Sequence, residues 1–379
     1  MADPLQTLAS TLTSISPILT ALVPPAAVVV LGFGPRAGPG RAFMLAARSW
    51  FHVARKVSQR DDATSTLRGM LQNLGEDQYI VVTGQKGIGK SVVVDTATQR
   101  TCGVVSVHVA PGTSQEAIVA KALSKVANSR VGFIDPLPSV TRVLWWYGRF
   151  LPRPIVVLHA VERREGQDFA DIPGAARELT GYGLRILIDG STNSLPSETL
   201  TTLRQRVLDL EPMTRDILHS IPEYASLLST LRKESLENVA WMVLGGVPSH
   251  FNELVAELKD CNEPSNHRRV LVKYLRNEII KAISRRDRML AAHPAMSTIL
   301  DLFKAPKEAL PESLLRKMGV VSPSPNKVLR VVLRDDCAML VPADAAMALV
   351  LRHGFEATPS IEELMKLSAC PVAVTPGPA

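Results

Sequence analysis

The sequence has little cysteine, and what it has is scattered. Four cysteines stand in 379 residues, none of them in a Cys-x-x-Cys pair, at Cys102, Cys261, Cys337 and Cys370. Such spacing indicates neither a zinc site nor a disulfide framework, so a reducing compartment is favoured. The apolar fraction of 46% is typical of a globular chain, and the length suits two domains better than one.

Charged residues are almost absent from the first 35 positions, where Asp3 stands alone. Residues 17–34 read PILTALVPPAAVVVLGFG, close to the roughly 17–25 apolar residues that cross a bilayer, but Pro24-Pro25 would kink or break a helix there. No basic residue precedes this run, which disfavours a cleaved secretory signal.

Acidic residues are then missing between Arg36 and Asp61, although several basic ones occur. This asymmetry resembles a membrane anchor with its basic flank on the cytoplasmic or matrix side. Residues 42–57 could also lie as a basic amphipathic helix on an anionic surface. An apolar arm packed against the domain or a partner explains the segment equally well, so both alternatives stay open.

The overall charge of +7, with a pI near 9.3, permits contact with nucleic acid or anionic lipid. Spread over the whole chain, the same excess also fits an ordinary solvated basic surface.

A phosphate-binding loop is the strongest pattern in the sequence. An apolar run that starts at Tyr79 gives way to GQKGIGKS, which satisfies GxxxxGK[ST] at every fixed position, and a helix-compatible stretch follows. A strand, a glycine-rich turn and a helix in this order separate a phosphate loop from a chance match. The predicted nucleotide-binding residues are Gly84, Gln85, Lys86, Gly87, Ile88, Gly89, Lys90, Ser91 and Val92.

The residue types explain the predicted chemistry. The glycines let the backbone wrap a phosphate with its N–H groups pointing inward, and a helix that opens at Lys90 offers further N–H groups and its positive dipole end. Lys90 is expected to reach the β- and γ-phosphates of ATP, and the hydroxyl of Ser91 to hold Mg²⁺.

Strands and helices alternate around this loop. Helical spacing predicts a helix within residues 61–77, capping residues Thr113 or Ser114 predict another over residues 116–127, and strands are expected at residues 103–109, 155–158 and 184–188. The aromatic cluster that starts at Trp145 is expected to be buried. This alternation predicts an α/β fold with a parallel sheet covered on both faces.

The acid that organises Mg²⁺ in P-loop NTPases is expected directly after the strand at residues 155–158. The sequence places His159 and Ala160 there, so no carboxylate is predicted to orient the metal shell through Ser91. Glu162 is the nearest candidate for a catalytic base, although it also reads as part of a charged surface turn. We therefore expect nucleotide to bind but to turn over slowly, and His159→Asp with Ala160→Glu to raise turnover.

Two further features are candidates for catalysis. Polar residues follow the strand at residues 184–188, so Asp189, Thr192 or Asn193 could sense the γ-phosphate, although a capped turn would look the same. Residues 198–206 are predicted to be helical, and Arg204 could serve as a finger toward the nucleotide of a neighbouring subunit. Ordinary surface arginines are the alternative.

The loop, the RPIVVL strand, the IDGS strand end and LEPM resemble the AAA+/STAND group of P-loop ATPases in kind and order. LGGVP, followed by Phe251 and Leu254, looks like the Gly-Gly motif of that group's helical lid. The lid is most similar to mitochondrial inner-membrane ATPases of the escape-protein type. This resemblance covers roughly residues 65–345 and implies a membrane-anchored ATPase linked to the maintenance of mitochondrial DNA.

The remaining chain predicts a lid helix with an apolar stripe at Leu271, Leu275, Ile279 and Ile283. Two short helices and a hairpin over residues 328–341 are compatible with a winged-helix module, with Lys327, Arg330 and Arg334 as basic wing residues that contact DNA or protein. The predicted divisions are residues 1–60, a P-loop domain at 61–215, a helical lid at 216–290, the C-terminal module at 291–370 and a tail.

Two classes of function fit the sequence. One is an intracellular, ATP- and Mg²⁺-binding switch or motor, tethered to a membrane or assembled into a homo-oligomer. The other is a non-catalytic scaffold that keeps nucleotide as a structural ligand and binds a protein or DNA partner. No NKxD-type guanine-reading motif is evident, which favours ATP over GTP.

Overall fold

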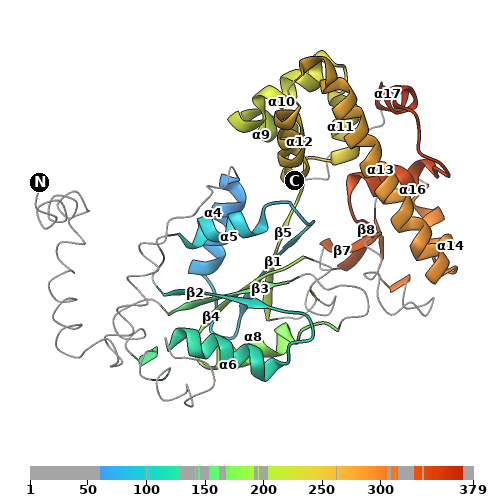
Figure 1. The fold of residues 1–379 in the computed structure, drawn as a ribbon. Coiled ribbons are helices and arrows are strands. Elements are labelled where there is room, and N and C mark those ends of the chain that lie inside the picture. Colours follow the sequence, from blue (N-terminus) through green and yellow to red (C-terminus); the bar gives the residue numbers. More distant parts are fainter. Residues whose placement is uncertain are drawn as a thin grey trace, which may run out of the picture.

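The chain folds into a parallel sheet flanked by helices, followed by a helical part and a small antiparallel sheet, as seen in a computed structural model (Figure 1). The structure describes residues 60–99, 101, 103–127, 141, 144–145, 153–161, 168–191, 195, 204–261, 263–304, 309–311, 313–314, 328–334 and 337–369. Glu162, Asn193, Thr192, Lys327 and the predicted N-terminal segment lie outside these ranges.

The large sheet has five parallel strands in the order β2-β3-β4-β1-β5. β1 therefore lies between β4 and β5, and β4 separates it from β3. The strands are β1 (Tyr79–Gly84), β2 (Val104–Val109), β3 (Ile155–Ala160), β4 (Arg185–Asp189) and β5 (Gln205–Leu210).

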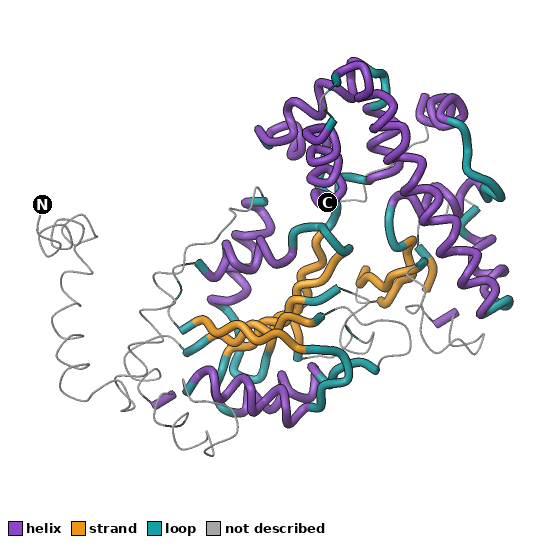
Figure 2. The backbone as a smooth tube through the Cα atoms, in the orientation of Figure 1, coloured by secondary structure: helices purple, strands orange, loops and turns teal. Residues whose placement is uncertain are grey.

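Helices cover both faces of this sheet (Figure 2). Alternate residues of β1 show the division, because Ile80 and Val82 pack with α4 and α5 in one apolar cluster, whereas Tyr79 and Val81 belong to the larger cluster that includes α6 and α8. Burial on both faces explains why the inner strands are continuous apolar runs. The helices are α4 (Asp61–Gln72), α5 (Lys90–Thr98), α6 (Gln115–Val126) and α8 (Ile172–Gly181).

The helix predicted over residues 198–206 is wrong at its C-terminal end. Gln205 begins β5, and its backbone pairs with the start of β1 at Tyr79. Most of β5 is only half-buried, and its QRVLDL sequence mixes polar and apolar residues. An edge strand tolerates such a mixture because one side of it has no neighbouring strand, so the apolar pattern was too weak to identify it.

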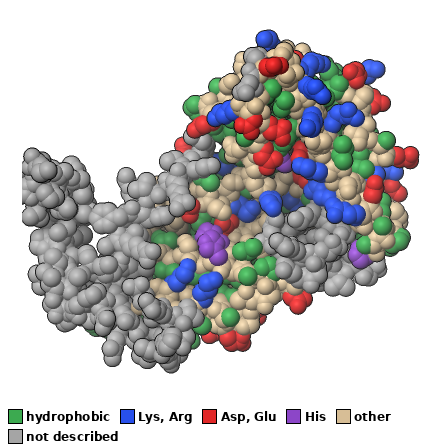
Figure 3. All heavy atoms as spheres, viewed as in Figure 1, with side chains coloured by type: hydrophobic (Ala, Val, Ile, Leu, Met, Phe, Trp, Pro, Cys, Tyr) green, Lys and Arg blue, Asp and Glu red, His purple; other side chains and the backbone are tan. Residues whose placement is uncertain are grey.

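Five helices follow the sheet and form the part predicted as a lid. The longest, α13, buries the predicted stripe of Leu271, Leu275, Ile279 and Ile283. Over this part, Figure 3 shows positive and negative side chains interspersed rather than a patch of one sign. The helices are α9 (Arg215–Ser220), α10 (Pro222–Lys233), α11 (Glu237–Leu244), α12 (Pro248–Asp260) and α13 (His267–Ala292), with a short 3₁₀ turn at Pro264–Asn266.

The C-terminal part contains the predicted hairpin, because β7 and β8 pair in antiparallel fashion. Arg330 of β7 is not an exposed wing residue, since its guanidinium lies 3.9 Å from Asp209 of β5 and only 14% of its side chain is exposed. The elements are α14 (Met296–Leu302), β6 (Leu310–Pro311), β7 (Leu329–Arg334), β8 (Cys337–Pro342), α16 (Ala345–His353) and α17 (Ile361–Ala369).

Trp145 was expected to be buried, but 56% of it is exposed. Within the described ranges, no helix is long and apolar enough to cross a membrane. Residues 17–34 lie outside those ranges, so the anchor and the arm both stay predictions.

Candidate nucleotide-binding site

The glycines of the phosphate loop adopt the conformations for which the motif requires glycine. Gly84, Gly87 and Gly89 have φ angles of +142°, +78° and +97°, which side-chain-bearing residues rarely adopt. A Cβ on Gly84 would also lie 2.8 Å from the carbonyl oxygen of Leu210 in β5. The loop is therefore a backbone cradle fixed between the ends of β1 and β5.

The positive charge of the cradle comes from Lys90 and from the start of α5. The Lys90 ammonium group donates hydrogen bonds of 3.1 Å to the carbonyl oxygens of Gly84 and Gln85, which draws it over the loop. Gly89 is the N-cap of α5, and no side chain accepts a hydrogen bond there. A helix start without a side-chain cap, next to a lysine, suits an anion such as a phosphate.

A carboxylate does lie beside Ser91, contrary to the expectation that none would. The Ser91 hydroxyl donates a hydrogen bond of 2.8 Å to Oδ2 of Asp189, at the end of β4. The reason is the order of the strands, because β4 is the neighbour of β1, whereas β3 with His159 lies one strand further away. The carboxylate in contact with Ser91 therefore comes from β4, at one of the positions predicted to sense the γ-phosphate, and not from the end of β3.

These oxygens fit Mg²⁺. The Ser91 hydroxyl donates its hydrogen bond to Asp189, so the lone pairs of its oxygen are left for a cation. Hydroxyl and carboxylate oxygens are ligands that this hard cation takes. Among the described residues there is no cluster of three or more acidic, histidine or cysteine side chains that could enclose a metal. Ser91 would hold such an ion, with Asp189 beside it, together with phosphate and water oxygens, as is usual for Mg²⁺ in phosphate-binding proteins.

His159 is the second partner of Asp189. Its Nδ1 lies 2.9 Å from Oδ2 of the same carboxylate, of which only 5% is exposed. The ring of His108 in β2 stacks on His159, with centroids 5.0 Å apart and planes inclined by 25°. The pKa of His108 is lowered mainly by burial, and to a smaller extent by the nearby His159 and two lysines.

Among the predicted catalytic residues, Asp189 and Arg204 are described, and Arg204 lies away from the site. Its carbonyl oxygen accepts a hydrogen bond of 3.1 Å from the amide of Tyr79, at the opposite end of β1 from Gly84. Arg204 is therefore far from the phosphate loop of its own chain, and a role at the nucleotide of a neighbouring subunit stays a prediction. Glu162 and Asn193 lie outside the described residues.

The lid touches the loop through Val247 of the LGGVP motif and through Ser249, which the sequence did not single out. The amide of Ser249 in the first turn of α12 donates to the carbonyl oxygen of Gly87, at 3.3 Å. Val247, just before this helix, packs in one apolar cluster with Ile88 of the loop. A proline at the first helical position, two residues after the Gly-Gly pair, was the available signal for a helix start here.

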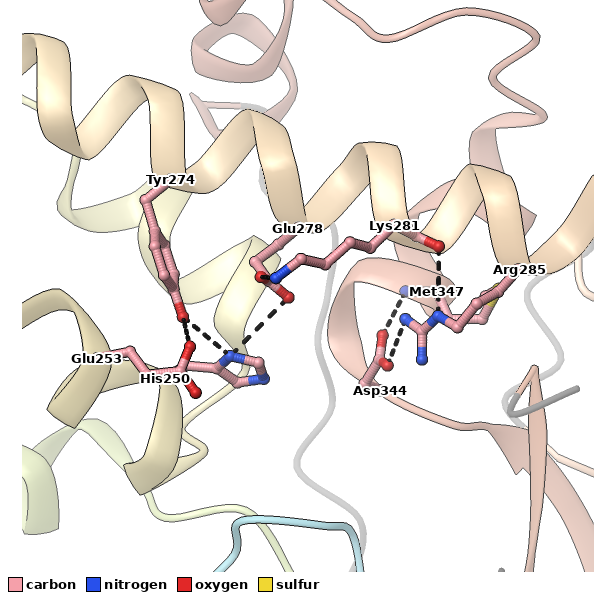
Figure 4. A network of polar contacts seen from close by, with 8 residues as sticks. All are labelled: His250, Glu253, Tyr274, Glu278, Lys281, Arg285, Asp344 and Met347. Atoms are coloured by element: carbon pink, nitrogen blue, oxygen red, sulfur yellow. Dashed lines mark hydrogen bonds and ion pairs between the residues drawn. The ribbon is translucent and has the colours of Figure 1, made fainter. Parts of the chain in front are cut away.

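Behind this contact, a polar network connects α12 to α13 (Figure 4). The Tyr274 hydroxyl donates to Glu253, at 2.6 Å, and lies 3.3 Å from Nδ1 of His250. Burial and the neighbouring carboxylates raise the pKa of Tyr274. One turn further along α13, the buried carboxylate of Glu278 accepts a hydrogen bond of 2.6 Å from Lys281.

No family model matches the chain, and no curated protein matches it. Three solved structures resemble it over most of their own length. A Walker-type ATPase of Pyrococcus abyssi is 17% identical, with 77% of this chain and 95% of that chain covered and a TM-score of 0.44. The ORC2 protein of Aeropyrum pernix, solved as ADPNP–ADP complexes, is 11% identical, with 84% and 96% covered and a TM-score of 0.40. Cdc6p of Pyrobaculum aerophilum is 12% identical, with 84% and 96% covered and a TM-score of 0.32.

The class of the protein follows from its own geometry. A parallel sheet covered by helices on both faces carries GxxxxGK[ST] between the end of β1 and the start of α5, with a serine and a carboxylate in hydrogen-bond contact beside it. This is the α/β core of a P-loop nucleotide-binding protein.

Proposed function

We propose that this chain is an ATP-binding P-loop protein of the AAA+ kind, in which bound nucleotide controls the contact between the phosphate loop and the lid. The observation that carries the proposal is the site itself, where Lys90, the start of α5 and the Ser91–Asp189 pair converge on one glycine-rich loop. The contact of Ser249 with Gly87 supports a role for the lid, because a ligand in the cradle would lie next to it.

Hydrolysis is proposed to be slow. Asp189 supplies the carboxylate that organises the metal, but Ala160 stands where a second carboxylate would polarise the attacking water. Phosphoryl transfer depends on such positioning, so its absence lowers turnover more than binding. Glu162 remains the candidate base, and Glu162→Gln would stop turnover if it fills that role.

Titration with a fluorescent ATP analogue tests binding. Lys90→Ala should weaken affinity by at least roughly tenfold, because it removes a charge-assisted contact to the phosphates. Lys233→Ala, at the exposed end of α10, removes the same charge far from the loop and should leave affinity unchanged. Equal affinity of the wild type and Lys90→Ala, with both folded by thermal melting, would refute the proposal.

A phosphate-release assay on the same proteins separates the two classes of function. A switch or motor should release phosphate in the wild type and not in Lys90→Ala. A non-catalytic scaffold, which the alanine at position 160 favours, should bind ATP without release in either protein. The further resemblance to mitochondrial escape-type ATPases, and assembly into a homo-oligomer, stay predictions.

A further inference from the structure

The side chains of His108, His159 and Asp189 form one row across the sheet. His108 pairs in register with His159, and His159 with Asp189, so three adjacent strands present them at the same level. Contacts run along the whole row, from the stacked imidazole rings to the carboxylate and on to the hydroxyl of Ser91. The row therefore leads from the edge strand β2 to the proposed metal position.

We propose that His159 is a positioning residue that holds the Asp189 carboxylate in the orientation in which Ser91 presents its oxygen to Mg²⁺. This inference rests on the proposed function, since it concerns the same site. In this arrangement, a histidine at the end of β3 supports an acid at the end of β4.

The proposal requires one tautomer of His159. A carboxylate oxygen accepts hydrogen bonds, so the tautomer that supports Asp189 is the one in which Nδ1–H of His159 donates to Oδ2. Because Asp189 is almost fully buried, it needs such donors to offset its loss of hydration. Among the described residues, Nδ1 of His159 and the hydroxyl of Ser91 fill this role.

The orientation of Asp189 depends on these donors. The χ2 torsion of an aspartate is broad and has no sharp staggered minima, so the backbone alone does not fix the carboxylate plane. Both hydrogen bonds end on Oδ2. Without His159 the carboxylate can turn, and Ser91 then loses the acceptor that directs its lone pairs toward the cation. The stacked ring of His108 limits rotation of His159 itself.

The geometry of the amide side chains provides a matched pair of variants. The amide nitrogen of asparagine is attached to Cγ, as Nδ1 is in histidine, so His159→Asn can keep the hydrogen bond. In glutamine the amide nitrogen lies one carbon further out, near the position of Nε2, so His159→Gln should not replace it. A purely structural requirement for a side chain of this size would not distinguish them in this order.

The experiment measures the affinity of the full-length protein for a fluorescent ATP analogue, once with Mg²⁺ and once with EDTA. In the wild type, Mg²⁺ should tighten binding. In His159→Ala and His159→Gln, the ratio of the affinity with Mg²⁺ to the affinity in EDTA should be roughly tenfold smaller than in the wild type. This is the size expected for the loss of one hydrogen bond to a charged group. The affinity measured in EDTA should not change. His159→Asn should keep most of the gain.

A double-mutant cycle completes the test. Asp189→Asn should lose the Mg²⁺ gain by itself, and His159→Ala should then add little, because both variants act through one carboxylate. An undiminished Mg²⁺ gain in His159→Ala, or an equal loss of affinity in EDTA, would overturn the inference. Failure of the proposed function looks different, since the wild type would then bind no better than Lys90→Ala under either condition.

Discussion

Gly246 illustrates, at the scale of one residue, how the turn between α11 and α12 depends on the absence of a side chain. Its φ is +72°, and a Cβ there would overlap the carbonyl oxygen of Met213. The carbonyl oxygen of Gly246 also accepts a hydrogen bond of 3.0 Å from the amide of Met213. The turn that carries Val247 and Ser249 to the phosphate loop is thus tied to the segment after β5.

Gly246→Ala should therefore destabilise the protein by more than the ~1–3 kcal/mol that a left-handed conformation costs a non-glycine residue. Gly183→Ala is a matched control, because Gly183 has a φ of +78° but an added Cβ there would have no other atom within 4 Å. Urea unfolding of both variants measures the difference. If Gly246→Ala is no less stable than Gly183→Ala, the close approach to Met213 has no energetic weight.

Single residues also show where the sequence was sufficient and where it was not. The phosphate loop could be predicted because its motif fixes residue types at fixed spacing, and its glycines have the positive φ angles that the motif implies. Asp189 was only one of several candidate sensors, because its closeness to Ser91 depends on the order of strands in space. The order of the strands in the sheet cannot be deduced from their order along the chain.

At the scale of elements, one aspartate joins two helices. Asp344 caps α16 by accepting a hydrogen bond of 2.8 Å from the amide of Met347, and it pairs with Arg285 of α13 at 2.6 Å (Figure 4). No more than 20% of either charged side chain is exposed. The contact fixes α16 to the helix that also carries the Tyr274 network.

Asp344→Ala should cost about 2 kcal/mol, since it removes a helix cap, worth ~0.5–2 kcal/mol, together with the ion pair. Asp344→Asn keeps the capping oxygen and should cost about half as much. Arg285→Ala should match Asp344→Asn, and combining these two should add little if they share one interaction. Thermal unfolding of the four variants checks this. Equal losses for Asp344→Ala and Asp344→Asn would mean that the cap contributes nothing.

Elements with a strong apolar pattern could be predicted, and those with mixed patterns could not. The inner strands were recognisable because burial on both faces makes them continuous apolar runs. For α6, the sequence left Thr113 and Ser114 open as caps, and the structure assigns the cap to Ser114 while Thr113 donates to Ala110. The prediction failed for β5, because an edge strand keeps polar residues, and its mixed pattern resembles that of an exposed helix.

At the scale of the whole molecule, the phosphate loop is connected to the C-terminal part by three consecutive contacts. α12 touches the loop through Ser249, and the network around Tyr274 joins α12 to α13. α13 in turn reaches α16 through Arg285. These contacts join Gly87 to α16 through packed helices. The sequence showed the lid only as a series of amphipathic segments.

Residues 17–34 are predicted to attach the whole chain to a membrane or to pack as an arm. If these residues insert as an anchor, the full-length protein should resist carbonate extraction, and removal of residues 1–41 should release it. Val29→Asp should weaken insertion, because an acid at the centre of a membrane helix costs at least ~2.5 kcal/mol.

Salt separates insertion from surface attachment by the basic residues that follow. Screening shortens to about 3 Å at 1 M salt, so a protein held only by charge is released by salt, whereas an inserted one is not. A protein in which residues 17–34 pack as an arm should be soluble at low salt, and Val29→Asp should then lower its melting temperature, because it places a charge in an apolar contact. Full-length protein that is soluble at low salt would rule out the anchor, and carbonate resistance that survives the deletion would place the attachment elsewhere in the chain.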